Sequence, residues 1–470
     1  MARTASQAPA PTFNADIRPI LSENCFHCHG VDAAKRKAGL RLDVEREAIA
    51  SGALVPGDAA ASVLVERLRS ADPDELMPPP SSHRALSEGD KRLIERWIDA
   101  GARYEEHWAF VAPTKAKAAP GEHPIDAAVR RRLAREGLSL SPEAPRETLV
   151  RRVTLDLTGL PPTLDEIDAF LADRAPGAYE RLVDRLLASP RYGERMVLPW
   201  LDAARYADSN GFQQDGDTFQ WVWRDWLVRQ LNADVPYDRL STEMLAGDLL
   251  PGATDETRLA TAFNRNHLLN GEGGAIPEEN RWTAMFDRVD ATATTWLGLT
   301  MSCAQCHDHK YDPITQRDYY ALLDAFNRVP EDGIVAGSPS RIRVAPPVLE
   351  YAGDELRARR MRLEGAVAAA EESLRMKGDL QRAARDEAQG ELDRFLRDEW
   401  PRVMVMSDAQ PRETHVLARG AYLSPAEKVA FATPAFLPPL APDAPRDRLG
   451  LARWLFADEN PLVARVAVNR

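Results

Sequence analysis

All four cysteines of this chain lie in two copies of one five-residue motif, Cys-x-x-Cys-His. The first copy reads CFHCH and the second reads CAQCH. Their defining residues are Cys25, Cys28, His29, Cys303, Cys306 and His307. No cysteine is left for a disulfide framework, so these two motifs account for all the thiol chemistry available to the chain.

Cys-x-x-Cys-His is the motif that attaches c-type haem. The two thiols add to the vinyl groups of the porphyrin, and the histidine, held on the same short turn, reaches the iron. Three other interpretations are a single Cys₄ zinc site, a dithiol redox centre and a plain structural pair. None of them requires a histidine directly after the second cysteine. We therefore expect two covalently attached haem c groups, with His29 and His307 as iron ligands.

The first haem also has a candidate sixth ligand. A small c-type cytochrome domain opens with a helix that leads into the motif, closes with a helix packed on it, and presents a methionine from the loop between. Here residues 13–21 lead into the motif, and residues 87–102 have amphipathic helical spacing with Ser87 and Asp90 as an N-cap pair. Met77 precedes three prolines, which keep the loop extended. We predict Met77 as the axial ligand; the alternative is a loop methionine packed on the core.

Charge and hydropathy restrict the partners of the chain. The formal net charge of −12 disfavours a nucleic-acid partner, because phosphate backbones are repelled. No run of 18 apolar residues is present, so we expect no membrane-spanning segment. The start of the chain has no apolar signal-peptide core. Since haem is attached covalently outside the cytoplasm, we expect a periplasmic or otherwise exported protein whose numbering begins after a cleavage site.

The residue patterns predict a mainly α protein. We expect a small cytochrome c-like helical domain, then a larger helical haem domain, then a long helical hairpin or coiled segment and a short β-containing segment. The expected ranges are a disordered N-terminus at 1–12, the first domain at 13–104, a linker at 105–122, the second haem domain at 123–335, the hairpin and β-containing junction at 336–440, and the start of a further domain at 441–470.

Several long stretches resemble the planctomycete-type cytochrome c proteins. The first domain resembles their N-terminal cytochrome domain (PSCyt1) through CFHCHG, LMPPP and IERWIDAGA. The second resembles their DUF1549 domain (PSCyt2) through LVRRVTLDLTGLPPT, WLDAARYADSNGF, NGEGGAIPEE and CAQCHDHKYDPITQRDYY. The final RDRLGLARWLFADENPLVARVAVNR resembles the opening of a truncated DUF1553 domain. The resemblance implies export, haem and a polysaccharide-degrading bacterium, but no established reaction. Many members have a histidine before the WLD triplet, where this chain has Pro199, so that ligand is missing here.

Charged side chains are dense in the second domain, between otherwise apolar helical stretches. Ionised groups in such surroundings need partners, and the propionates of a haem would supply them for arginine and lysine. We expect a set of these residues to converge near the second motif as a catalytic or substrate pocket; the alternative is structural ion pairing. The set is Arg205, Asp208, Glu272, Asp287, Arg288, His309 and Lys310.

The sixth ligand of the second haem is less evident. His415 lies in an otherwise apolar, strand-like segment and is the candidate metal ligand, with His267, Met285 and Met301 as alternatives. The other interpretation of His415 is a hydrogen-bonded core histidine. A filled sixth position would favour electron transfer, and an open one would favour chemistry at the iron.

Two functions fit these features. The first is electron transfer by a di-haem c-type cytochrome, outside the cytoplasm, to a redox partner protein or a membrane acceptor. The second is a haem-coupled oxidoreductase that acts on a carbohydrate or related polymer fragment, with the N-terminal haem as the electron exit. A third, a binding module with haem as a structural staple, is weaker. Both motifs serve electron transfer without a further assumption, so the sequence favours it.

The two motifs predict two haems per chain. The intact mass of the protein, exported together with a haem-maturation system, is expected to show two haem additions, because both motifs are complete and no other cysteine competes. A mass that matches bound zinc without haem would contradict this prediction.

Overall fold

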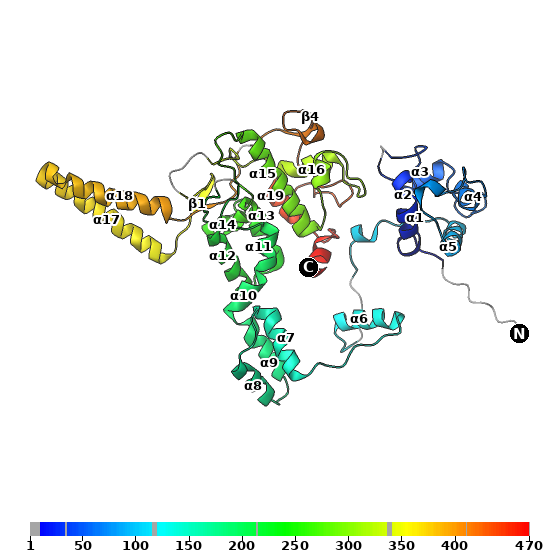
Figure 1. Ribbon diagram of the computed structural model, residues 1–470, viewed down its shortest axis with the longest axis horizontal. Coiled ribbons are helices and arrows are strands. Elements are labelled where there is room, and N and C mark those ends of the chain that lie inside the picture. The colour runs from blue at the N-terminus through cyan, green and yellow to red at the C-terminus, as the bar shows by residue number, and fades with distance from the viewer. Residues whose placement is uncertain are drawn as a thin grey trace.

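The computed structural model describes residues 10–32, 35–114, 120–212, 215–335, 341–409 and 411–469. In these ranges the chain is mainly helical, as predicted, with a few short strands in its C-terminal third. Figure 1 shows a small N-terminal domain beside a larger helical body, from which one long helical hairpin projects. The disorder expected at 1–12 falls mostly outside the described residues.

The N-terminal domain is closed by aromatic packing between its two ends. The ring centroid of Phe13 lies 5.5 Å from that of Trp97 and 4.2 Å from that of Tyr104. The predicted capping box of Ser87 and Asp90 is present and starts the closing helix. The helical elements are η1 (Phe13–Ile17), α1 (Arg18–Asn24), α2 (Phe26–His29), α3 (Glu45–Ala50), α4 (Val63–Arg69), η2 (Pro80–Ser82) and α5 (Glu88–Asp99).

In the second region, one helix is followed by a small three-helix unit with its own apolar cluster, and the chain then continues into the main body. A capping box between Thr163 and Glu166 starts the second helix of this unit. The elements are α6 (Pro124–Arg135), α7 (Arg146–Thr158), α8 (Leu164–Ala172), α9 (Ala178–Leu187), α10 (Pro190–Met196), α11 (Leu198–Ala204), α12 (Trp221–Asn232), α13 (Tyr237–Ala246), α14 (Asp255–Ala260), η4 (Thr261–Arg265), α15 (Pro277–Thr292), η5 (Ala293–Leu297), η6 (Ser302–Gln305), α16 (Gln316–Leu323) and η7 (Asp324–Phe326).

The C-terminal third contains the projecting hairpin and two small antiparallel sheets, β1–β2 and β3–β4. The hairpin consists of two helices packed on each other, as the sequence predicts. The elements are β1 (Val348–Glu350), α17 (Asp354–Lys377), η8 (Gly378–Gln381), α18 (Arg382–Asp398), β2 (Arg402–Met404), β3 (Thr414–Leu417), η9 (Ala418–Gly420), β4 (Pro425–Val429), α19 (Arg448–Leu455) and α20 (Val463–Asn469).

None of the helices in the described ranges is both long and apolar enough to cross a membrane.

The segment predicted as a linker is bound to the body over one short turn, η3 (Trp108–Phe110). The ring of Phe110 packs edge-on against Phe436, with centroids 5.0 Å apart. The guanidinium of Arg465 donates to the carbonyls of Ala109 and Val111 at 3.1 and 2.7 Å. These contacts fix the point at which the chain passes from the first domain to the body.

A buried ion cluster holds α19 in the body. The side chain of Arg448 is fully buried, and its Nη2 atom lies 2.7 Å from Asp248 Oδ2 and 2.6 Å from Asp408 Oδ1. Its Nη1 atom also donates to the carbonyl of Leu245, at the end of α13, at 2.7 Å. Burial raises the pKa of Asp408, and Arg448 opposes that rise. One guanidinium therefore compensates two carboxylates that have little access to water.

Replacing this arginine is expected to destabilise the fold strongly. Arg448→Met leaves Asp248 and Asp408 buried without their cation, and breaking a buried pair in this way costs about 3–5 kcal/mol of unfolding free energy. Arg317→Met is the matched control, because Arg317 pairs with Glu427 at a solvent-exposed site. Chemical denaturation of both variants measures the difference. Equal stability of the two would contradict the assigned role of Arg448.

Candidate haem-attachment sites

The first motif consists of Cys25, which follows α1 directly, and the single turn of α2. The backbone N–H groups of Cys28 and His29 both donate to the carbonyl of Cys25, at 3.1 and 2.9 Å. Gly30 follows, and a Cβ at this position would lie 2.4 Å from the carbonyl oxygen of Phe26, so no larger residue fits there. Both cysteines and the histidine are therefore held on a single short stretch of backbone, as haem attachment requires.

The chemistry of these residues fits a haem better than a redox dithiol. Cys25 is buried in the apolar cluster of the first domain, and burial raises the pKa of its thiol to about 12. Dithiol redox centres work in the opposite direction, with a lowered thiol pKa. Burial lowers the pKa of His29. Its imidazole ring is therefore neutral, which is the form that binds iron.

Met77 lies in the loop that the sequence predicts, partly buried, between α4 and η2. Its N–H donates to the carbonyl of Arg67 at 3.0 Å, which joins this loop to the end of α4. Met77 is thus on a fixed loop of the haem domain, and its role as the axial ligand stays a prediction.

The second motif is more open than the first. It begins in η6 and continues past its end; Cys303, Cys306 and His307 are all solvent-exposed, and Ala304 is buried. The Nδ1 atom of His307 is hydrogen-bonded to the carbonyl of Asp308 at 2.8 Å. A backbone carbonyl on one ring nitrogen leaves Nε2 as the metal-binding nitrogen, the usual arrangement for a histidine ligand.

Residues far along the chain support this second motif, and sequence reasoning did not identify them. Tyr320 on α16 donates its hydroxyl to the carbonyl of Gln305 at 2.9 Å. Gln316 donates to the carbonyls of Gln305 and Leu417, at 3.0 and 2.9 Å, and so joins the motif to the end of β3. A Cβ on Gly420 would lie 2.9 Å from the Sγ atom of Cys306. For Gly420, the one feature visible in the sequence was an Arg-Gly pair in the turn that follows a predicted strand.

The zinc alternative does not agree with the structure. The described residues include all four cysteines, and nowhere among them do three or more His, Cys, Asp or Glu side chains gather closely enough to hold a metal ion. The two motifs therefore do not combine into one Cys₄ site. Each stands as a separate pair of free thiols followed by a histidine.

One cavity, with a volume of about 790 Å³, touches the surroundings of both motifs. Phe26 and His27, between the two cysteines of the first motif, line it on one side. Residues 310–313, which begin three residues after His307, line it on the other, and Phe110 and Phe436 contribute aromatic rings. The first motif and the segment that follows the second motif thus line the same cavity.

The structure joins part of the predicted polar set. The Nη2 atom of Arg205 lies 2.5 Å from Asp287 Oδ2, so these two residues form an ion pair as well as a hydrogen bond. Burial raises the pKa of Asp287, and Arg205 and the neighbouring Arg288 oppose that rise. Arg205 also has a left-handed backbone with φ of 56° at the end of α11, a conformation that costs free energy for a residue with a side chain.

The remaining four residues of the set make their contacts elsewhere. Asp208 is exposed and accepts the hydroxyl hydrogen of Tyr206. Glu272 is exposed on the loop before α15. His309 accepts N–H bonds within its own turn, and Lys310 lies over the ring of Tyr311 beside the cavity. The catalytic role predicted for the seven residues stays a prediction.

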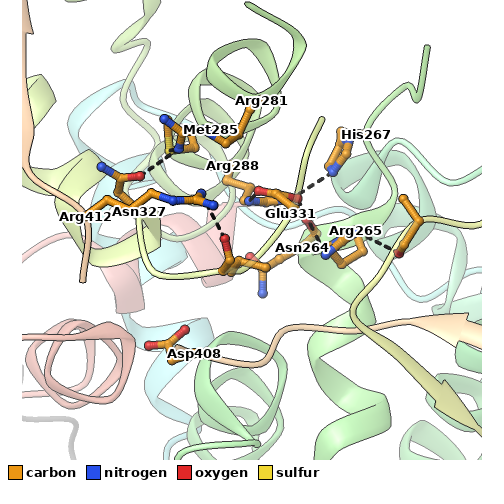
Figure 2. A network of polar contacts seen from close by, with 12 residues as sticks. Asn264, Arg265, His267, Arg281, Met285, Arg288, Asn327, Glu331, Asp408 and Arg412 are labelled. Atoms are coloured by element: carbon orange, nitrogen blue, oxygen red, sulfur yellow. Dashed lines mark hydrogen bonds and ion pairs between the residues drawn. The ribbon is translucent and has the colours of Figure 1, made fainter. Parts of the chain in front are cut away.

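Arg288 belongs to a buried network rather than to a surface pocket. Figure 2 shows it between Glu331 and His267, with Arg265 on the same carboxylate. Arg288 pairs with both oxygens of Glu331, and the Nη1 atom of Arg265 lies 3.5 Å from one of them. Burial alone would raise the pKa of Glu331, but Arg288 and Arg265 lower it below its usual range. Glu331 therefore stays ionised in the interior.

The same network contains His267, one of the candidates for the sixth ligand of the second haem. Burial, together with Arg288, lowers the pKa of His267 to about 3, so its ring is neutral. Its Nε2 atom is bonded to Arg288 at 3.0 Å and its Nδ1 atom to the carbonyl of Leu268 at 2.9 Å. The Sδ atom of Met285 likewise accepts from Arg281 at 3.3 Å. Of the four residues predicted as candidates for the sixth ligand, His415 on β3 and the buried Met301 therefore remain.

Fold and sites together define a mainly α protein whose N-terminal domain has the organisation of a small c-type cytochrome. Residues 25–81 match the family described as planctomycete cytochrome C, PSCyt1. Residues 124–331 match PSCyt2, a family of unknown function that is also called DUF1549.

The chain therefore carries a planctomycete cytochrome C domain, the kind of domain that binds covalent haem c, followed by a DUF1549 domain. The matched ranges do not extend to 441–470, so the DUF1553 resemblance of that segment stays a prediction. Neither the curated proteins nor the solved structures contain a match to this chain.

The axial role of Met77 can be tested by substitution. Met77→Ala is expected to abolish the methionine–iron absorption band at the red end of the spectrum and to lower the potential of the first haem, because a His/Met pair raises it. Met361→Ala, at an exposed position of the projecting hairpin, is the matched control. A Met77→Ala protein with an unchanged spectrum would show that another residue is bound.

Proposed function

We propose that this chain is a di-haem c-type cytochrome that passes electrons between its two haem sites, outside the cytoplasm, and on to a redox partner protein or a membrane acceptor. The cavity between the first motif and the segment after the second motif is the observation that carries this proposal. Phe26 and His27 lie on one wall and residues 310–313 on the other, so the opening borders the first motif and the chain that leads out of the second. Two haems held there would be neighbours although their motifs are far apart in the chain.

The open character of the second motif supports the same proposal. His307, Cys303 and Cys306 are exposed, whereas Cys25 is buried, so the two sites differ in their access to water. Burial and solvent exposure are among the factors that set the potential of a haem. Two haems in such different surroundings are expected to differ in potential, which gives electron flow between them a direction.

Electron exchange within one molecule tests this function. The protein is mixed with less reductant than its haems can accept, and the redistribution of electrons is followed by stopped-flow absorbance. We expect a redistribution rate that does not depend on protein concentration. The Cys303→Ala/Cys306→Ala double variant, which keeps only the first motif, is the control and should lack this phase. A rate proportional to protein concentration, or a wild-type chain with one haem, would contradict the proposal.

The same cavity favours one alternative function. Its volume of about 790 Å³ lies within the usual range for small-molecule sites, and its lining combines aromatic rings with charged side chains. We therefore keep a haem-coupled oxidoreductase acting on a carbohydrate or related polymer fragment as the second proposal. Reduction of the haems on anaerobic addition of an oligosaccharide, without any other reductant, would favour it over simple electron transfer.

A further inference from the structure

Among the buried side-chain atoms of the second domain that have no hydrogen-bond partner, three belong to one group: Oδ1 of Asp290, the hydroxyl of Tyr319 and Nε of Arg205. They come from the last turn of α15, from α16 and from the end of α11. Electrostatic contacts place them together, because Asp290 interacts with Arg205 and Tyr319 interacts with Asp290. Buried polar groups are normally paired, so a concentration of unpaired ones calls for a functional explanation.

Competition for one cation explains why Asp290 is left over. Asp287 and Asp290 are three residues apart on α15 and share a face of that helix. Asp287 holds Arg205 in the 2.5 Å ion pair, and no other arginine or lysine contributes to the charge balance at Asp290. Burial and the neighbouring Asp287 together raise the pKa of Asp290 to about 7, against the opposing effect of Arg205. This carboxyl therefore changes its charge near neutrality.

The same carboxyl is connected to the second motif. The chain leaves α15 through the π-helical turn η5 and reaches η6 a few residues later. Such π-helical turns are frequent at functional sites. Tyr319 is fully buried and interacts with Asp290, Asp287 and Cys306, while its neighbour Tyr320 donates to the backbone of the motif. Burial raises the pKa of Tyr319, so its hydroxyl remains neutral.

The other charged groups on and beside α15 are hydrogen-bonded to other partners and do not contact Asp290. Arg288 is bonded to Glu331 and His267, on the interior side of the helix. Asp318 on α16 accepts N–H bonds from Thr315 and Ala435, and Asp324 on η7 accepts from Phe431. The groups that face Asp290 are thus Asp287, Arg205, Tyr319 and, through Tyr319, Cys306.

We propose that Asp290 is the proton-exchanging residue of the second haem site. It takes up one proton from a hydronium ion of the solvent when the haem held at the second motif receives one electron from the reduced first haem, and it releases that proton on reoxidation. One O–H bond of the hydronium ion breaks as the O–H bond on Asp290 forms, while the first haem would lose one electron and the second would gain it. A loss of positive charge at the iron makes a nearby carboxylate more basic, which couples the two events. This inference rests on the proposed function, because it requires a haem at the second motif.

The midpoint potential of each haem, measured as a function of pH, tests the proposal. Asp290 is neutral below its pKa and negative above it, and a negative charge stabilises the ferric iron. The potential of the second haem is therefore expected to fall as the pH rises through about 7. Asp290→Asn should hold it at the high value across this range, Asp290→Glu should restore the fall, and the exposed Glu427→Gln should leave it unchanged.

Redox-difference infrared spectroscopy gives an independent result. Reduction of the second haem near pH 7 should produce a protonated-carboxyl band in the wild type that Asp290→Asn lacks. A wild-type protein with two haems by mass but a pH-independent second potential overturns this inference and leaves the proposed function standing. A chain with a single haem overturns the proposed function itself. If Asp290→Asn fails to fold, the wild-type potential, the infrared band and Asp290→Glu still decide the question.

Discussion

The charge of Glu331 has to be neutralised inside the second domain, and the placement of α15 depends on this requirement. Arg288 on that helix pairs with both oxygens of the carboxylate, and Arg265 approaches it from η4 (Figure 2). A buried carboxylate left without these cations would be strongly destabilising. Arg265 also donates to the carbonyls of Ala345 and Pro346, so the network connects α15 to the segment before β1.

Fixing α15 in this way sets the geometry of the second motif. With Arg288 turned toward Glu331, the adjacent Asp287 and the following Asp290 lie on the side of Arg205 and Tyr319. The helix then runs through η5 toward η6, which carries Cys303. One interior ion cluster thus orients the acidic pair, and the same helix leads directly into the attachment motif.

Features with a local chemical signal were predictable from the sequence. The capping box of Ser87 and Asp90, the helical hairpin and the strand that contains His415 depend on residues close together in the chain, and all were found. The partner of Arg288 was not, because Glu331 lies 43 residues further on in a loop without a pattern. The residues on α16 and Gly420 that contact the second motif were not predicted, because they too lie far from it in the part of the chain that follows. Strand β4 begins with proline and contains charged residues, so its sequence does not predict a strand.

Magnetic coupling between the two ferric haems tests the central claim, that both motifs hold haem and that the two haems are neighbours. Electron paramagnetic resonance of the fully oxidised protein is expected to show two ferric haem signals whose relaxation is enhanced by mutual dipolar interaction. In the Cys25→Ala/Cys28→Ala variant the remaining signal should relax more slowly, because its neighbour is gone. A single ferric haem in the wild type, or two signals that relax as they do in isolation, would contradict the account.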